Sequence, residues 1–411
     1  MRSRTTGDVD AAWRDERAKL VASLARRFRD LSLAEDAVQD AFAEAVRRWP
    51  RDGPPDRPGA WLTTTAHRKA IGILRRRRPT SSLAEEHLTQ EHLADEDVAT
   101  AGWRGDLDRD LFGLIFACCH PALDADARVA LTLRHVCGLT TAQISAALVT
   151  SEAAMAKRLV RARRKIRDAG ISFAVPTTDE VAARLDDVRL VIYLVFNEGY
   201  LGSDHGPAVR TELCDEAIWL ARQLRRLQPD DETSGLLALM LLHHARRDAR
   251  QDPTGRLVRL PEQRRTEWHR DEIDEARAVL ETTGRALGPF QVEAAIALCH
   301  VVGPEPDWAR IADLHGVLGR LAPSAVVEVN RALAVGRADG PRAGLAVLGP
   351  VLTGDRLGGY PHLHAVHADL LERAGDDLGA AAAWRRAAEA TSAPDQRAEL
   401  LRRAHANDRE R

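Results

Sequence analysis

The stretch GLTTAQISAALVTSEAAMAKRLVRARRKI (residues 138–166) decides how this sequence is interpreted, because two helical patterns follow each other across a tight connection. Thr140 and Gln143 have capping-box spacing, which predicts a short first helix. Ser151 is a favourable N-cap for a second helix. Within that second helix, apolar residues at i, i+4, i+7 and i+11 form one inward stripe: Met155, Leu159, Ala162 and Ile166. The pattern predicts a helix-turn-helix, whose second helix enters a DNA major groove.

The second helix is strongly basic. Residues 152–170 hold seven lysines and arginines, opposed by Glu152 and Asp168 alone. Such a helix repels itself unless an anion neutralises it. Arginine can read guanine through two hydrogen bonds, and neighbouring cations neutralise phosphates, so we predict DNA binding. The alternative interpretation is a solvated surface helix, which is what most basic runs are.

Composition points to a soluble, cytoplasmic, multidomain protein. The chain has 411 residues, 45% of them apolar and 29% charged, with a net charge of −2, and this length suggests two to four domains. It has no apolar run of membrane-spanning length, and its first ten residues lack the apolar core of a signal peptide. The five cysteines are odd in number and irregularly spaced, which argues against a disulfide framework. We therefore expect no membrane partner.

The fold class expected throughout is all-α. Aromatic residues make up only 4% of the chain, alternating β-branched runs are almost absent, and apolar residues recur at three- and four-residue steps. Charge is unevenly distributed along these helices. Residues 128–170 carry a net charge of +7, whereas residues 79–103 hold six acidic residues and no lysine or arginine. Blocks of opposite sign suggest that different segments meet different partners.

The N-terminal part predicts three helices. Residues 11–49 hold two helical patterns that divide near Asp30, and the second begins with Ser32 and Glu35 at capping-box spacing. Its predicted apolar face comprises Ala34, Val38, Ala41, Ala45 and Trp49. The proline- and glycine-rich stretch 50–59 is expected to be a loop, and residues 60–78 to be the third helix.

Three segments in this order resemble a known family. LSLAEDAVQDAFAEAVRRW (31–49), PGAWLTTTAHRKAIGILRRRR (58–78) and the helix-turn-helix are similar to a sigma-70 factor of the extracytoplasmic-function group. The resemblance covers residues 10–172. It implies a sigma region 2 at 1–78, an acidic flexible linker at 79–105 and a sigma region 4 at 106–172. The implied function is transcription initiation: the protein binds core RNA polymerase and directs it to −10 and −35 promoter elements.

The same resemblance assigns site residues. The residues expected to bind core polymerase are Asp36, Gln39 and Asp40. The residues expected at the −10 DNA are Trp61, Arg68, Arg75, Arg76 and Arg77. The residues expected at the −35 DNA are Ser151, Lys157, Arg158, Arg161 and Arg164. The alternative interpretation of Asp36, Gln39 and Asp40 is that they only keep the helix surface soluble. Arg68 stands where the family usually has asparagine, Gly72 where the subgroup often has aspartate, and Ala156 where a basic residue is frequent. The promoter sequence that the family recognises therefore cannot be assumed for this protein.

Residues 173–411 resemble the long C-terminal extension of one subgroup, a helical domain like a tetratricopeptide (TPR) repeat. The segment 365–400 has the expected helix, glycine-containing turn and second helix. Residues 176–411 carry a net charge of −7, which excludes a second DNA clamp. Stacked helix pairs make a concave surface suited to a protein or peptide. We expect the extension to regulate the sigma regions in cis and to have a regulatory protein partner. The alternative is a purely stabilising role.

No catalytic residue, metal site or cofactor is predicted. ACCHPAL (117–123) places two cysteines beside a histidine, but adjacent helical residues diverge by about 100° and cannot easily share a tetrahedral ion. FNEGY (196–200) offers one carboxylate, which is no catalytic constellation, and an Asn with Gly two residues later also occurs where helices end. The P-loop, HExxH and GxSxG motifs of common enzymes are absent. The alternative function is a helix-turn-helix regulator with a sensing domain, binding duplex DNA without polymerase.

Overall fold

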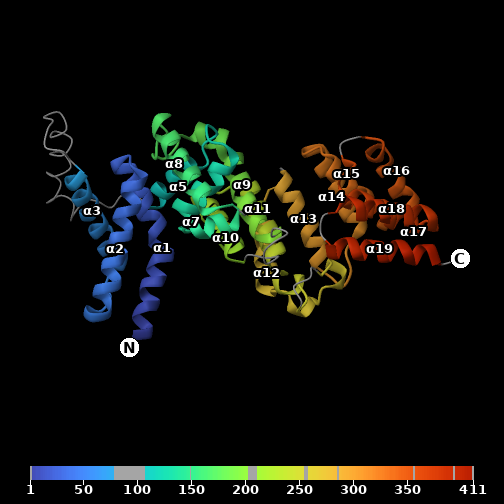
Figure 1. The fold of residues 1–411 in the computed structure, drawn as a ribbon, viewed down its shortest axis with the longest axis horizontal. Helices are drawn as coiled ribbons and strands as arrows, with labels where there is room; N and C mark the ends of the chain where they lie inside the picture. The colour runs from blue at the N-terminus through green and yellow to red at the C-terminus, as the bar shows by residue number, and fades with distance from the viewer. Residues whose placement is uncertain are drawn as a thin grey trace. The chain divides into compact units, whose positions relative to one another are not determined.

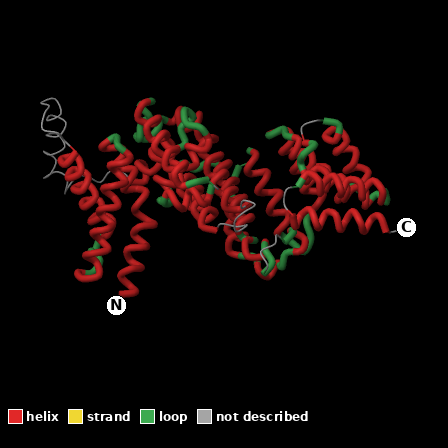
Figure 2. The backbone as a smooth tube through the Cα atoms, viewed as in Figure 1, coloured by secondary structure: helices red, strands yellow, loops and turns green. Residues whose placement is uncertain are grey.

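The computed structural model describes residues 2–77, 107–148, 150–201, 211–253, 258–284, 287–354, 357–391 and 394–409. These residues form helices and loops without a β-strand among them (Figure 2), which confirms the all-α prediction. The chain divides into two compact units, Met1–Val195 and Phe196–Arg411, and each is described by itself. The predicted acidic linker at 79–105 lies outside the described residues.

Three helices begin the first unit (Figure 1): α1 (Arg2–Phe28), α2 (Leu31–Asp52) and α3 (Pro58–Arg77). They pack on one another because α2 turns its apolar stripe inward. The five residues predicted for that stripe, from Ala34 to Trp49, are all buried. The helical division near Asp30 is therefore confirmed.

Two details of this part were wrong. The N-cap of α2 is Asp30, whose Oδ1 accepts hydrogen bonds from the backbone N–H of Ser32 (2.9 Å) and Leu33 (3.0 Å). Ser32 and Glu35 therefore form no capping box, because the helix starts earlier than predicted. The loop expected at 50–59 is shorter, since α2 continues through Pro50 to Asp52 and α3 begins at Pro58. Proline fits at the first position of a helix, where its missing N–H has no partner to lose.

The second half of the first unit contains the helix-turn-helix. Its elements are α5 (Leu107–Cys118), α6 (Ala125–Leu131), the π-helical segment η2 (Thr132–Val136), α7 (Thr141–Ala147), α8 (Glu152–Asp168) and the start of α9 (Thr178–Leu201). The predicted capping box is present: Gln143 N–H donates to Thr140 Oγ1 at 3.1 Å, and Thr140 N–H donates to Gln143 Oε1 at 2.8 Å. The four predicted stripe residues of α8 are all buried. Both helices therefore form as predicted.

The second unit is a succession of helices, most of them joined by short connections, with a longer segment between His244 and Arg270 that contains three single-turn helices. They are α10 (Thr211–Leu227), α11 (Asp231–His244), α12 (Arg270–Glu281), α13 (Pro289–Val301), α14 (Trp308–Leu321), α15 (Ala325–Ala338), α16 (Pro341–Leu352), α17 (Pro361–Arg373), α18 (Asp377–Ala390) and α19 (Pro394–Arg409), with single-turn helices η3 (Arg247–Arg250), η4 (Leu260–Glu262) and η5 (Arg265–Glu267). Sequence neighbours pack against each other, most extensively α17 on α18 and α18 on α19. Small residues permit this close packing: Trp384 lies in a core cluster of alanines that includes Ala368 and Ala404. Among the described residues, no helix is long and apolar enough to cross a membrane.

The FNEGY segment lies inside a helix rather than at its end. Helix α9 continues through Gly199 to Leu201, so the helix-end interpretation of Asn197 was wrong. The reason is tertiary packing. The Tyr200 ring stacks on Phe196 with centroids 5.5 Å apart, its hydroxyl accepts a hydrogen bond from Arg246 at 2.9 Å, and the Arg250 guanidinium lies 3.5 Å from its ring centroid. These contacts extend the last turn beyond the point where local sequence would end it.

Candidate nucleic-acid interface

Helix α8 separates its basic and apolar residues on opposite faces. At 100° per residue, Lys157, Arg161 and Arg164 fall within about 60° of one another. The buried stripe from Met155 to Ile166 lies on the opposite side. All three basic residues are exposed. The helix therefore presents a continuous cationic stripe while its other face holds it in the core.

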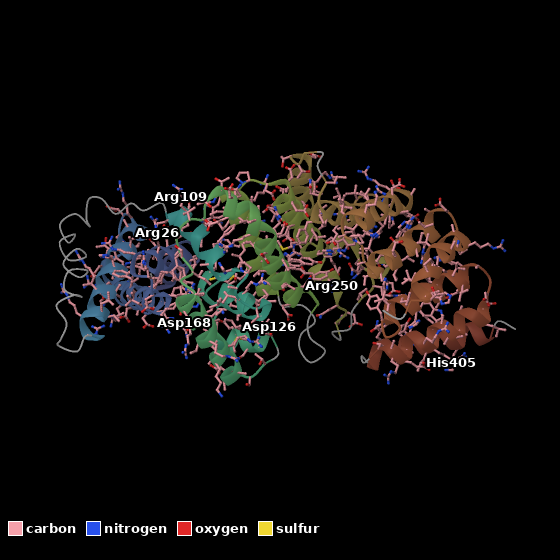
Figure 3. The ribbon with its side chains drawn as sticks, turned by 90° about the horizontal axis from the view of Figure 1, so that it is seen from above. Arg26, Arg109, Asp126, Asp168, Arg250 and His405 are labelled. Atoms are coloured by element: carbon pink, nitrogen blue, oxygen red, sulfur yellow. The ribbon has the colours of Figure 1, made fainter. Side chains whose placement is uncertain are left out.

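Two of the α8 arginines predicted at the −35 DNA form ion pairs within the protein. Arg158, 31% exposed, pairs with Asp126 of α6 at 3.1 Å. Arg164 pairs with Asp168 at the end of α8 at 3.3 Å. Both carboxylates lie on the surface of the helix-turn-helix part (Figure 3) and are more than half exposed. Exposed pairs of this kind contribute at most about 1 kcal/mol, so a phosphate can replace the carboxylate at little cost.

Ser151 holds the start of α8. Its Oγ accepts a hydrogen bond from the backbone N–H of Ala154 at 3.2 Å, as an N-cap does. A hydroxyl that accepts one hydrogen bond can still donate another. Ser151 therefore has a demonstrated structural role, and its contact with DNA stays a prediction.

Helix α3 carries a second stripe. Trp61, Arg68 and Arg75 are spaced by seven residues and so share one face of the helix. Trp61 packs edge-on against buried Trp49 with ring centroids 5.7 Å apart, which fixes the start of this face on α2. Arg68, Arg75 and Arg76 are exposed. Arg77 is the last residue of α3, and its side chain lies outside the described set.

The three predicted polymerase-binding residues lie together on α2. Asp36, Gln39 and Asp40 are all exposed, and their i, i+3, i+4 spacing places them on one face. That face is opposite the buried stripe of α2, so it is available to a partner protein.

Sequence reasoning missed a buried charge cluster that joins the two halves of the first unit. Glu35 of α2 is only 4% exposed. Its Oε1 lies 3.0 Å from Arg134 Nε, 3.4 Å from His135 Nδ1 and 3.5 Å from the guanidinium of Arg17. Burial alone would raise the pKa of Glu35, but His135, Arg134 and Arg17 outweigh burial and lower it. Glu35 is therefore an ionised carboxylate in the core, which is stable only because cations surround it.

Further polar contacts run along the same seam. Arg17, itself 5% exposed, donates to the backbone carbonyls of Arg134 (3.1 Å) and His135 (3.2 Å). Arg26 of α1 pairs with buried Asp110 of α5 at 2.5 Å, and Lys19 pairs with Asp108 at 3.0 Å. Local sequence patterns contain no signal for this seam, because hydrogen-bonded partners in it are up to 118 residues apart. We refer to the contacts of Glu35 with Arg17, Arg134 and His135 as the Glu35 cluster.

The paired cysteines belong to the core. Cys118 and Cys119 are fully buried, and burial raises the pKa of both thiols, that of Cys119 to about 12. Cys119 Sγ lies 3.7 Å from Thr132 Oγ1. The neighbouring His120 Nδ1 accepts a hydrogen bond from the backbone N–H of Ala122. Within the described ranges, no group of three or more His, Cys, Asp or Glu residues has the arrangement to hold a metal ion.

Comparison with protein families assigns both halves of the first unit. Residues 14–80 match Sigma-70 region 2, and residues 114–166 match Sigma-70 region 4. Residues 184–284 match a family of unknown function, DUF6596. The first two matches coincide with α1–α3 and with the helix-turn-helix, and both belong to a non-enzymatic family.

Similar proteins support the same division. An uncharacterized protein of Rhizobium meliloti, R00370, is 42% identical over 95% of this chain and 94% of its own length. The probable ECF RNA polymerase sigma factor SigI of Mycobacterium tuberculosis is 33% identical over 43% of this chain and 60% of its own length. The ECF RNA polymerase sigma factor SigK of Mycobacterium ulcerans is 29% identical over 35% of this chain and 76% of its own length. The sigma likeness is confined to part of the chain, whereas the rhizobial likeness runs nearly end to end. The chain therefore carries a sigma-70 region 2 and a sigma-70 region 4 of the extracytoplasmic-function kind, followed by a DUF6596 helical region, and it belongs to one family with the rhizobial protein.

Proposed function

We propose that this protein is a sigma subunit that binds core RNA polymerase and directs it to promoters. One observation carries the proposal: a region 2 precedes a region 4 in one chain, and the recognition helix α8 exposes a basic stripe opposite its buried stripe. The exposed stripe suits the −35 element through Lys157, Arg161 and Arg164, with Arg158 and Ser151 at its edge. Cytoplasmic localisation follows from this function.

Region 2 would supply the two other contacts. Asp36, Gln39 and Asp40 would meet basic side chains of the polymerase. The Trp61–Arg68–Arg75 face of α3 would meet the −10 element, where a ring can stack on an unpaired base and arginines can follow the strand backbone. Arg76 and Arg77 would add phosphate contacts at the end of the helix. The exposure of Asp36, Gln39, Asp40, Arg68, Arg75 and Arg76 and the shared faces described above support these roles.

This function requires the two sigma regions to separate. The −10 and −35 elements are about 25 base pairs apart, which is about 85 Å at 3.4 Å per base pair. In this structure the regions pack directly through the Glu35 cluster. We therefore infer that this packed arrangement is a free, closed form and that polymerase and promoter binding replace it with an open one.

The C-terminal helices would be the regulatory part. The packing of α15 on α16 and of α17 on α18 would suit TPR-like repeats. With a net charge of −7 for residues 176–411, they suit a protein partner better than nucleic acid. We propose that they regulate the sigma regions in cis and answer to such a partner.

The test is transcription with sigma-free core polymerase, the purified full-length protein and fragmented genomic DNA, followed by sequencing of RNA 5′ ends. Starts that need this protein and share upstream elements are the expected result. Binding to duplex DNA without polymerase, combined with no starts, would contradict the sigma proposal and favour an ordinary helix-turn-helix regulator.

A truncation then tests the C-terminal unit. The suitable fragment is 1–195 rather than 1–172, because α9 residues pack on the helix-turn-helix part: Arg128 pairs with Asp187 at 2.6 Å. Increased transcription by the fragment would indicate inhibition by the C-terminal unit, and lost transcription would indicate a requirement for it. Unchanged transcription would leave only a stabilising role.

A further inference from the structure

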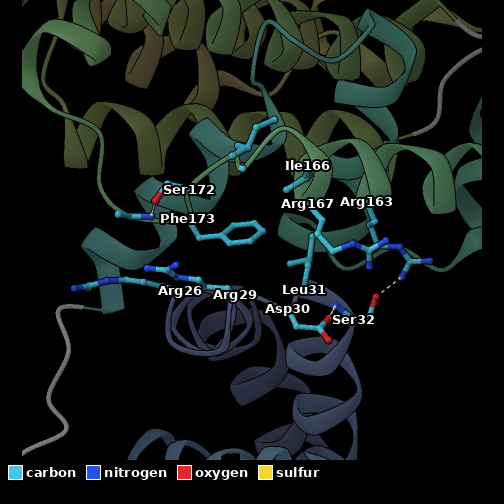
Figure 4. A pocket seen from close by; sticks show the side chains of 13 residues that line it. Arg26, Arg29, Asp30, Leu31, Ser32, Arg163, Ile166, Arg167, Ser172 and Phe173 are labelled. Atoms are coloured by element: carbon cyan, nitrogen blue, oxygen red, sulfur yellow. Dashed lines mark hydrogen bonds between the residues drawn. The ribbon is translucent and has the colours of Figure 1, made fainter. Parts of the chain in front are cut away.

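A cavity of about 790 Å³ lies at the seam between the two sigma regions. Its walls come from the end of α1, the start of α2, the last turns of α8 and the segment 170–174 that follows (Figure 4). Ligand pockets typically have volumes of about 300–1,000 Å³, so the cavity could hold a molecule of nucleotide size. Duplex DNA, whose major groove alone is about 12 Å wide, is too large to enter.

The lining of this cavity is strongly cationic. Arginines reach it from both regions: Arg26 and Arg29 from region 2, and Arg163 and Arg167 from region 4 (Figure 4). Asp30 is the acidic residue of the lining, and its carboxylate is already occupied as the N-cap of α2. The lining holds four arginines and one carboxylate, and this excess of positive charge predicts an anionic ligand.

The neighbouring contacts neutralise these arginines unevenly. Arg26 pairs with Asp110 at 2.5 Å, while Arg163 donates to Ser32 Oγ at 3.3 Å and lies 3.9 Å from Glu35. Arg167 has only the exposed Asp168 at 3.9 Å. Arg29 forms no ion pair with any described residue. Arg29 and Arg167 therefore have the most freedom to bind an anion.

The backbone at Arg29 gives a second, independent indication. Arg29 has φ +51°, and among the described residues it is the one non-glycine with a positive φ. It directly follows the last residue of α1, a position where glycine normally adopts this conformation without strain. An arginine at such a site costs conformational energy, and strained residues concentrate at functional sites.

The cavity also offers an apolar surface between its arginines. Leu31, Ile166 and Phe173 line it and are each at least nine-tenths buried, with Phe173 6% exposed. Figure 4 shows the Phe173 ring and Leu31 between the arginines of the two regions. An aromatic ring beside guanidinium groups suits a ligand that carries both a planar base and phosphates.

These arginines are separate from the proposed DNA stripe. By the 100° period of α8, Arg163 and Arg167 lie about 80–120° away from Lys157, on the flank that faces region 2. Arg163 itself contacts Ser32 of α2. The cavity therefore lies beside the DNA stripe, with Arg163 facing region 2 and Arg167 about 60° from Arg164 at the edge of the stripe.

We propose that the cavity binds a small phosphorylated ligand of the nucleotide class. Its phosphates contact Arg29, Arg163 and Arg167, and its base contacts Phe173. Because both regions supply these groups, the ligand binds the closed form and opposes opening. This last consequence, inhibition of transcription, rests on the proposed function.

The test is calorimetric titration of the full-length protein with ATP, and separately with tripolyphosphate, in magnesium-free buffer. Saturable ATP binding is expected, and tighter binding of ATP than of tripolyphosphate would assign a role to the base. Equal binding would identify the ligand as a polyphosphate alone. No saturable binding of either probe up to about 1 mM, an affinity of roughly 4 kcal/mol, would overturn the site.

Arg29→Gly is the decisive variant, because it removes the guanidinium and also relieves the strained φ. We expect it to weaken binding about tenfold or more while leaving the thermal midpoint equal or higher. Arg47→Ala is the matched control: Arg47 is exposed on α2, about 24 Å along the helix from Leu31. Equal weakening by both variants would indicate non-specific charge attraction and overturn the site.

The binding assay contains no polymerase, so it separates this proposal from the sigma proposal. Binding that depends on Arg29 without any promoter starts would leave the site valid and contradict the sigma function. Starts without ATP binding would contradict the site alone. If both proposals hold, Arg29→Gly should give more transcript than the wild type in the same reaction, because the ATP present as a transcription substrate occupies the wild-type cavity.

Discussion

Buried Glu35 in the first unit and partly buried Glu293 in the second unit behave in opposite ways. Glu35 in the first unit lies among Arg17, Arg134 and His135, which lower its pKa. Glu293 in the second unit has no such cations. Burial, together with the nearby Glu232, raises its pKa to about 7. At Glu35 the first unit therefore keeps a buried carboxylate ionised with nearby cations, whereas burial controls the carboxyl group of Glu293.

This difference bears on which parts of the molecule can separate from one another. An ion-paired seam can open into water because its charges are rehydrated and can find new partners, such as phosphates or polymerase side chains. The second unit also has ion pairs between its elements, such as Arg247 with Glu272 and Arg337 with Asp369, both at 2.9 Å. Its helices approach so closely that a Cβ built on Gly235 of α11 would lie 2.5 Å from the backbone N of Gln291 of α13. We therefore infer that the two sigma regions of the first unit can separate, whereas the helices of the second unit stay packed.

The largest expected effect comes from Glu35→Gln. The substitution leaves the Arg17 guanidinium, 5% exposed, without its carboxylate. Breaking one partner of a buried ion pair typically costs about 3–5 kcal/mol, and we expect a loss of that order in the stability of the first unit. Denaturant unfolding measures the loss, and hydrogen exchange should locate it by faster exchange in η2.

Glu44→Gln is the matched control for this substitution. Glu44 lies on the same helix, and its partners Lys69 and Arg48 both belong to region 2. These ion pairs lie largely at the surface. We therefore expect Glu44→Gln to lower the free energy of unfolding by less than about 1 kcal/mol and to leave hydrogen exchange in η2 unchanged. Equal losses for the two variants would contradict the view that the Glu35 cluster joins the regions.

Gly235→Ala tests the second half of the comparison. The added methyl would meet backbone atoms of Gln291, which cannot rotate away. We expect a loss of about 2–3 kcal/mol in the second unit, since overpacking outweighs the better helix propensity of alanine. Gly316→Ala in α14 is the control, because no atom lies within 4 Å of its added Cβ, and it should stabilise by about 0.5–1 kcal/mol. If both variants stabilised the second unit, the contact between α11 and α13 would have room for a methyl group, which would contradict the close packing described above.

Arg161→Ala tests whether the basic stripe of α8 binds promoter DNA. Arg161 is exposed in the middle of the α8 stripe, so its removal should leave stability nearly unchanged. We expect promoter binding by the holoenzyme to weaken by about 1–3 kcal/mol if the side chain reads a base. Arg277→Ala, an exposed arginine of α12, controls for the loss of one positive charge. Unchanged affinity and salt dependence after Arg161→Ala would remove this part of α8 from the DNA interface.

Local sequence was sufficient for the helix-turn-helix but not for the seam. The Thr140–Gln143 capping box and the Met155–Ile166 stripe depend on neighbours within a few residues, so periodicity and capping rules predict them. The position of Glu35 depends on Arg134, about a hundred residues away, and its spacing from Ser32 imitated a capping box. Likewise, α9 passes through the FNEGY segment because of Tyr200 contacts with Arg246 and Arg250. Such tertiary contacts override local helix-ending signals.

Glu293→Gln gives the smallest effect and the sharpest contrast with Glu35. The folded pKa of Glu293, about 7, exceeds its ordinary value of 4.5, so between these pH values the folded protein binds more protons than the unfolded chain. Stability conferred by this residue is therefore lost as pH rises from about 4.5 to 7, and the full penalty of a buried carboxylate remains above about pH 8. Glutamine removes that penalty but must bury its own amide, so we expect a gain of about 1–2 kcal/mol at pH 8 and almost none at pH 5. Thermal and denaturant unfolding at both pH values measure the difference.

Glu35→Gln should destabilise at pH 8, where Glu35 is fully ionised, so the two glutamates should respond with opposite sign at the same pH. A loss of stability for Glu293→Gln at pH 8 would mean that an ionised partner supports this carboxylate as cations support Glu35, and the contrast between the units would fail.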